Sequence, residues 1–371
     1  MAPVRIVVGA LGGALVALVL TEIFLSYLLP RRVKRDPRLV RRLQGYAWRP
    51  WRAVARRLPD ATRDTLLGVF GPLGVIFGLA LWVLGLMLGY AALQWAAGSH
   101  VLPGGRAGIG DDLYFSAASL VASGTGTLRS SNGFARTVQI LDAASGFAVL
   151  TIVIGYLPAL AQAFSRREAT VSQLDARAGS PPSAGRLIVR STERDGWPAL
   201  NGYLSEWETW AAELMETHLS YPALAFFRSQ HVNQSWLSAL TTVLDSCSFA
   251  IAAAPVGEAW GADLTYAIGL HAVSDLAHTL GTKDTAAREP RLSRETLEEL
   301  CRMLEEEGLE ITAELDDIAE RLRELTEAYE PRIHALAQTL ELPLPVWLID
   351  GEEQRNWQRS GTRPHRRAPL P

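Results

Sequence analysis

Three long apolar segments alternate with polar and basic stretches in the first half of the chain. They cover about residues 6–29, 66–95 and 138–164, and each reaches the roughly 20 residues that an α-helix needs to cross a bilayer. The first segment could instead be a signal peptide, but its n-region would be confined to residues 1–5, and no small-x-small cleavage site follows. The pattern therefore predicts an uncleaved N-terminal anchor over residues 1–30 and two further transmembrane helices.

Basic residues give these helices an orientation. Arginines crowd the segment 31–65, and Arg166 and Arg167 come directly after the third apolar segment. Because the cytoplasmic flanks of membrane helices are enriched in Arg and Lys, both regions are predicted to lie inside the cell. The sequence thus predicts a multi-pass protein of the cell inner membrane or plasma membrane, with a cytoplasmic C-terminal domain.

Aromatic residues lie among the arginines of the segment 31–65. Tyr46, Trp48 and Trp51 would suit an interfacial helix whose arginines bind anionic lipid. Alternatively, the arginines only fix the topology. Both interpretations remain open from the sequence.

Glycines recur along one helix face of the second apolar segment. Small residues on one face let membrane helices approach closely, and the partner could be the first segment, the third segment or a neighbouring subunit. The glycines are Gly71, Gly74, Gly78, Gly85 and Gly89.

A short helix and a glycine turn are predicted between the second and third apolar segments. Asp111 and Asp112 are suitable N-terminal capping residues, and the helix would run to about Val121. Gly124 and Gly126 then allow unusual backbone angles. Irregular backbone at membrane depth is tolerated only where protein or water surrounds it, and cation channels use such a turn to line a filter with carbonyls. The alternative is an ordinary extracellular turn.

The stretch Ser119–Leu128 resembles the pore signature of the P-loop potassium channels, bacterial two-span type, usually written T-x-T-T-V-G-Y-G-D-L. The segment 136–150 is similar to the inner helix of that family, with an acidic residue, Asp142, before a glycine, Gly146. The resemblance implies a pore domain over 66–163, a hinge at Gly146, a homotetramer, and a monovalent cation, with K⁺ expected, as the permeant ion without any other cofactor. It implies a selectivity filter formed by Ala122, Ser123, Gly124, Thr125 and Gly126.

Three positions depart from this signature. Ala122 stands where the family usually has Thr, Thr125 where it has Tyr or Phe, and Thr127 where it has Asp. Ala122 offers no hydroxyl to an inner ion site, and Thr125 is too small to brace a filter alone. The filter is therefore degenerate, and the sequence leaves both the selectivity and conduction itself open.

The C-terminal half is predicted to be soluble and helical. The chain has 371 residues and a net charge of only −3, but its basic block and its Glu-rich stretch at 293–330 are far apart, as expected for a membrane part joined to a soluble part. Pro and Gly predict a linker over 164–190, apolar residues at helical spacing predict a helical domain over 191–350, and a polar tail over 351–371 is predicted to be disordered.

No motif in this half indicates an enzyme or a bound metal. There is no nucleotide-binding fingerprint and no paired nucleophile and base, and the two cysteines imply no disulfide framework. His271, Asp275 and His278 could share a helix face, but such a set more often lies at the edge of a core.

The sequence as a whole predicts an all-α membrane protein with a re-entrant pore helix and filter loop, plus an all-helical cytoplasmic domain. The leading hypothesis is a cation channel subunit. The alternatives are a non-conducting membrane receptor or scaffold that keeps the pore-like fold and binds partners through its cytoplasmic helices, and a membrane-anchored enzyme with a pocket around His218 or His271. No nucleic-acid partner is expected.

Overall fold

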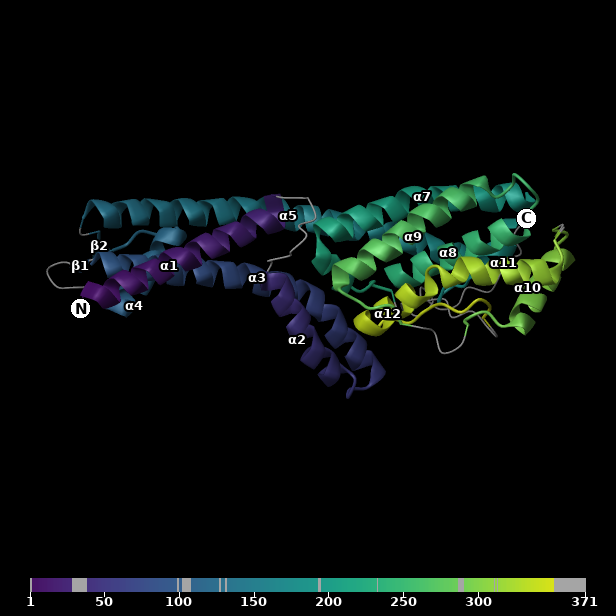
Figure 1. Ribbon diagram of the computed structural model, residues 1–371, viewed down its shortest axis with the longest axis horizontal. Coiled ribbons are helices and arrows are strands. Elements are labelled where there is room, and N and C mark those ends of the chain that lie inside the picture. Colours follow the sequence, from purple (N-terminus) through teal and green to yellow (C-terminus); the bar gives the residue numbers. More distant parts are fainter. Residues whose placement is uncertain are drawn as a thin grey trace, which may run out of the picture. The chain divides into compact units, whose positions relative to one another are not determined.

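A computed structural model describes most of the chain in two compact units, Met1–Ala161 and Gln162–Pro371 (Figure 1). Both units are helical, and the prediction of an all-α protein is confirmed for the part of the chain that is described. The two strands found there have only two residues each. The described residues are 2–28, 39–98, 100–101, 108–126, 128–130, 132–192, 195–231, 233–285, 290–309, 311 and 313–349.

The first unit contains the elements predicted for the membrane part, and its long helices follow from the apolar runs. One helix, α5, begins in this unit and continues into the second. The predicted tail 351–371 and residues 29–38 of the basic segment lie outside the described residues. The elements are α1 (Ala2–Ile23), a π-helical turn η1 (Phe24–Leu28), α2 (Leu39–Ala55), α3 (Asp60–Ala97), β1 (His100–Val101), α4 (Ile109–Leu120), β2 (Leu128–Arg129) and α5 (Gly133–Ala178).

Four helices in the described part of the chain are long and apolar enough to cross a membrane, as expected of a membrane protein. Three of them, Pro3–Tyr27, Asp60–Ala97 and Gly133–Ala178, contain the three predicted spans, and most of their apolar surface is exposed. The fourth helix is α8 (Trp236–Ala253), and 89% of its residues are buried within the second unit. A helix that is apolar on every side is buried either in lipid or in a protein core, and α8 belongs to a core.

Two glycines of the predicted face of α3, Gly85 and Gly89, pack against α1, whereas Gly74 faces Gln44 of α2. A Cβ at Gly89 would lie 2.6 Å from Cγ2 of Val16, and a Cβ at Gly85 would lie 2.8 Å from Cγ2 of Val19. Gly12 of α1 comes equally close to the backbone of α3, because its Cβ would lie 2.7 Å from the Gly89 carbonyl oxygen. The sequence left three possible partners open, and these contacts identify the first segment as the partner of Gly85 and Gly89.

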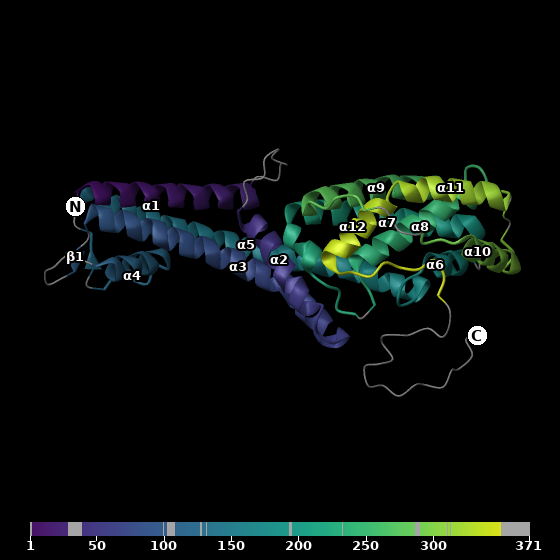
Figure 2. The ribbon, with the colours of Figure 1, turned by 60° about the horizontal axis from the view of Figure 1, so that its bottom comes forward.

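The basic segment forms an amphipathic helix, α2, that packs on the first turns of α3. The ring centres of Trp48 and Phe70 are 4.7 Å apart, and the indole N–H of Trp51 donates to the Leu66 carbonyl at 3.0 Å. Farther along, α3 bends away from the direction of this hairpin (Figures 1 and 2). Pro72 lies inside α3 and explains the bend, because proline removes one helical hydrogen bond and its ring crowds the preceding turn.

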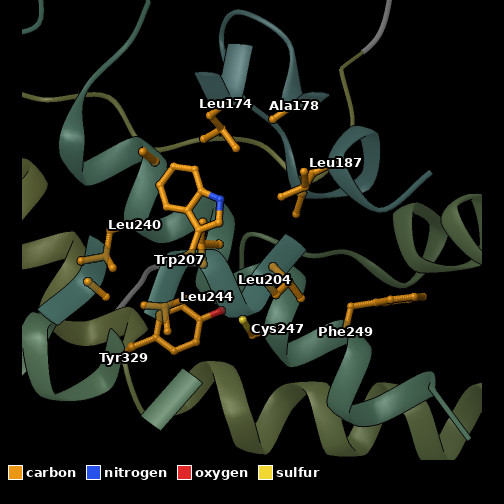
Figure 3. Close-up of a cluster of buried hydrophobic side chains, with 14 of the residues drawn as sticks. Leu174, Ala178, Leu187, Leu204, Trp207, Leu240, Leu244, Cys247, Phe249 and Tyr329 are labelled. Carbon is orange, nitrogen blue, oxygen red and sulfur yellow. The ribbon is translucent and has the colours of Figure 1, made fainter. Parts of the chain in front are cut away.

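The second unit surrounds α8 with the other helices (Figure 2). Apolar side chains from α5 to α8 and from Tyr329 meet in one core, with Trp207 at its centre (Figure 3). The unit also contains α6 (Ala184–Thr192), α7 (Gly196–Ser220), a 3₁₀ turn η2 (Pro222–Phe226), α9 (Trp260–Leu280), α10 (Arg294–Glu306), α11 (Leu315–Glu327) and α12 (Glu330–Leu340).

The predicted linker over 164–190 is helical over most of its length. Helix α5 continues to Ala178, and α6 begins at Ala184, so that only a short turn separates them. Leu174 and Leu187, on either side of the turn, are buried in the core. Gly and Pro correctly mark the turn itself, but the flanking amphipathic residues make it a helix–helix connection rather than a linker between domains.

Candidate functional site

The chain between the end of α3 and the start of α5 forms a long connection, and the two ends of this connection lie next to each other. Strands β1 and β2 pair antiparallel, with His100 opposite Arg129 and Val101 opposite Leu128. Helix α4 and the segment 121–126 lie between these strands in the sequence. The strand pair therefore closes the base of an excursion that contains every residue predicted for the pore helix and filter.

Helix α4 begins at Ile109 with Gly108 at the N-cap position, so the two aspartates predicted to cap it lie within its first turn instead. The backbone N–H of Gly108 donates to the carboxylate of Asp111 at 2.8 Å. Asp111 therefore holds the start of the helix, and its negative charge suits the positive end of the helix dipole. Asp112 is buried instead, on the face of α4 that also carries Ser116 and Ser119.

The other end of α4 lies deep along α5. A Cβ added at Gly146 would collide with the carbonyl oxygen of Leu120, the last residue of α4. An α-helix rises about 1.5 Å per residue, so Gly146 lies roughly 20 Å along α5 from its first residue, Gly133. Ser116 faces Asp142, one turn before this contact on both helices, so α4 and α5 run side by side in the same direction.

Gly146 was predicted to be a hinge, and the contact with Leu120 gives it a separate role. Helix α5 passes through this position without a break. Only glycine lets the carbonyl end of α4 come so close to the α5 backbone. Close packing, the alternative explanation for this glycine, thus has a definite partner.

The segment after α4 adopts an alternating backbone conformation. Ala122, Gly124 and Gly126 have φ angles of 53°, 91° and 59°, and each is in the left-handed region. This conformation is open to glycine but strained for alanine. The alternation prevents the segment from continuing α4 or forming a strand, and it leaves the segment exposed along residues 121–124.

The loop is tied to α4 by its N–H groups. Ala122 donates to the Ser119 carbonyl at 3.1 Å, and Ser123 donates to the Ala118 carbonyl at 3.0 Å. Within the described part of the chain, no hydrogen bond reaches the carbonyls of Ala122, Ser123 and Gly124. These carbonyls are consequently available to a ligand with positive charge.

Thr125 differs from the other members of the predicted filter. Its carbonyl accepts from the Leu128 N–H at 3.1 Å, and its hydroxyl donates to the Leu128 carbonyl at 3.2 Å. These bonds brace the returning chain within the loop itself. Thr125 stands where the channels that the sequence resembles usually have an aromatic ring, and it braces the loop with hydrogen bonds instead.

Several polar side chains of α3, α4 and α5 are buried in the first unit, and no motif in the sequence predicts them. The hydroxyls of Tyr90 and Ser145 are hydrogen-bonded at 2.7 Å, and the side-chain amide of Gln94 donates to the Ala135 carbonyl at 3.0 Å. Ser116 and Ser119 of α4 are buried as well. Their spacing of three residues on one helix face was the available signal, but serine at such spacing is common in membrane helices.

The end of α5 is fixed in the second unit by a buried arginine. Arg167 donates to the carbonyls of Leu224 at 2.9 Å and Phe227 at 2.8 Å, and it lies 3.2 Å from Nε2 of His218. Burial and the charge of Arg167 lower the pKa of His218 to about 3. The imidazole is therefore neutral, with Nδ1–H donating to the Leu214 carbonyl at 2.8 Å.

The structure places the histidines considered for catalysis or metal binding in structural or exposed positions. Both ring nitrogens of His218 are engaged, and His271 and His278 are exposed on α9. Among the residues described, no group of three or more His, Cys, Asp and Glu side chains could hold a metal ion. The loop after α4 is therefore the strongest candidate for a functional site.

The chain matches no protein-family model, no curated protein and no solved structure. The resemblance to P-loop channels thus rests on the residues and geometry described above.

Proposed function

We propose that this protein is the subunit of a P-loop channel for monovalent cations, with K⁺ as the expected permeant ion. The observation that carries the proposal is the path of the chain between β1 and β2. Helix α4 runs along α5 as far as Gly146, and the chain returns through a loop in which three carbonyls accept no hydrogen bond from the described residues. In a bilayer, this excursion would be re-entrant, and such backbone is stable there only beside water or protein.

The direction of α4 suits a cation. Its C-terminal end carries the negative half of the helix dipole, and the loop carbonyls add further negative partial charge. Both features lie at the inner end of the excursion. A cation that entered from the side of β1 and β2 would meet the loop and then the end of α4.

The apolar exterior of α5 supports assembly in a membrane. Ile140, Phe147 and Ile154 recur every seven residues on one face and are 68%, 72% and 66% exposed. Lipid or other copies of the chain would cover such a face. Four loops are needed to surround an ion in channels of this class, so the proposal includes a homotetramer.

Helix α2 supports the predicted orientation and a lipid partner. It exposes an apolar stripe that includes Leu43, Tyr46 and Val54, and arginines such as Arg49 lie beside the stripe. An amphipathic helix with arginines at its polar edge suits the surface of an anionic leaflet. The proposal accordingly places α2 at the inner leaflet and the second unit in the cytoplasm.

The bonds of Thr125 favour one competing function. Because its carbonyl is already occupied by Leu128, the loop offers fewer free carbonyls than a full filter. A non-conducting receptor or scaffold could keep this pore-like fold and bind partners through its second unit.

A flux assay on purified full-length protein in vesicles tests the channel proposal. Wild type is expected to pass K⁺, and Gly124→Ala is expected to reduce the flux, since a left-handed alanine costs about 1–2 kcal/mol. Gly110→Ala is the matched control, because both glycines have open space around them but only Gly124 has a positive φ. An absence of cation flux from wild-type tetramers would contradict the proposal and favour the receptor.

A further inference from the structure

We propose that Asp142 is a proton-binding site that controls how α4 and its loop are seated on α5. The inference rests on the proposed function, because the loop that it regulates is the proposed filter. The ligand is a proton, bound by the Asp142 carboxylate at the interface of α4 and α5.

Asp142 is completely buried, and its carboxylate has no hydrogen-bond partner among the described residues. The residue is 0% exposed in a single subunit, so neighbouring subunits or lipid could only add to its burial. Neither carboxylate oxygen has a hydrogen-bond partner among the residues that the structure describes. Ser116 faces it from α4, and the Ser116 hydroxyl is also without a hydrogen-bond partner there.

No positive charge faces Asp142 from the described parts of the neighbouring elements. From α3, the titratable group is Tyr90, whose hydroxyl is engaged with Ser145 at 2.7 Å. From α4, it is Asp112, about one turn farther toward the start of the helix and also buried. On α5 itself, Arg136 lies more than one turn away and is exposed.

The protonated form fits this environment better than the ionised form, which among the described residues only the Ser116 hydroxyl could partly stabilise. A buried carboxylate without a partner is so unfavourable that it takes up a proton instead. A carboxylic acid can also donate a hydrogen bond, and the hydroxyl oxygen of Ser116 can accept it. The nearby carbonyl end of α4 at Leu120 adds negative partial charge and opposes ionisation further.

Loss of the proton would disturb the contact that positions the loop. Asp142 lies one turn before Gly146, where α4 ends against α5. A new negative charge there repels the carbonyl end of α4, and the N–H groups of Ala122 and Ser123 are tied to the last turn of that helix. The seated form of α4 is therefore favoured at low pH, and flux is expected to fall as pH rises.

Infrared spectroscopy of the purified full-length protein detects the proton directly. Wild type is expected to have a protonated carboxyl C=O band that disappears as pH rises. Asp142→Asn, a neutral isostere of the acid, is expected to lack this band, and Asp112→Asn, the matched buried control, is expected to retain it. A spectrum of Asp142→Asn with the same titrating band as wild type would overturn the proposal. If Asp142→Asn does not assemble, a wild-type spectrum without a titrating band would also overturn it.

Flux in vesicles at matched pH on both sides separates this inference from the channel proposal. Wild-type flux is expected to fall with the band, by up to about tenfold per pH unit, and Asp142→Asn flux to stay constant. An equal pH dependence in both proteins would overturn the inference. A titrating band without flux in any protein would leave the proton site standing and remove the channel.

Discussion

Two buried aspartates show how differently the two units are stabilised. Asp245 and Asp142 are both 0% exposed. Asp245 of α8 accepts two hydrogen bonds from Arg291, at 2.9 and 2.6 Å, and one from the Tyr329 hydroxyl at 2.6 Å. Asp142 has no such partner in the described residues. Arg291 neutralises the charge of Asp245 within the second unit. Asp142 in the first unit has no such counter-ion among the described residues, and the proposed proton takes its place.

Apolar side chains show the same contrast. Trp207, Trp236 and Trp347 are fully buried in the second unit, whereas Ile140 and Phe147 of the first unit are exposed. The second unit thus completes its own core. The first unit leaves apolar faces that only lipid or further subunits would cover, and this difference is what the membrane proposal explains.

The largest expected effect comes from breaking the ion pair in the second unit. Arg291→Met leaves Asp245 buried without its cation, and such a loss costs about 3–5 kcal/mol. Chemical denaturation of the full-length protein in detergent, followed by tryptophan fluorescence, measures the change. The control is Arg294→Met, which removes exposed ion pairs to Glu298 and Asp316 and is expected to change little. Equal stability of Arg291→Met and wild type would contradict the contrast between the units.

A smaller effect is expected at the contact between α4 and α5. Gly146→Ala introduces a Cβ against the Leu120 carbonyl, and overpacking of this kind costs about 1–3 kcal/mol. Thermal unfolding and flux should both be affected, because α4 must shift to make room. Gly155→Ala is the control, since nothing lies within 4 Å of a Cβ at that position of the same helix. If both variants behave alike, the seating of α4 on Gly146 is wrong.

The sequence predicted the long helices better than their environments. Apolar length alone identified α1, α3 and α5, because a continuous apolar run of this size has few alternatives. Length and composition alone do not separate α8, which was predicted within the helical C-terminal domain, from a membrane helix, since both are long and largely apolar. The difference lies in the surrounding helices, which belong to distant parts of the chain.

The sequence predicted those features of the candidate site that depend only on residues close together in the chain. Gly124 and Gly126 indicated left-handed conformations, and Asp111 indicated the start of a helix. The meeting of Asp142 with Ser116 depends on the register of α4 against α5. That register is set by one tertiary contact, and no local pattern contains it.

Thiol accessibility in the loop tests the channel proposal most directly. Ser123→Cys would place a thiol beside a free carbonyl in the exposed loop, and the native Cys247 and Cys301 are both buried. A membrane-impermeant thiol reagent added outside is expected to abolish the flux of Ser123→Cys in vesicles. Wild type, whose two cysteines are buried, is the control and is expected to keep its flux. Complete labelling of Ser123→Cys with unchanged flux would contradict the account, because the loop would then lie outside the ion path.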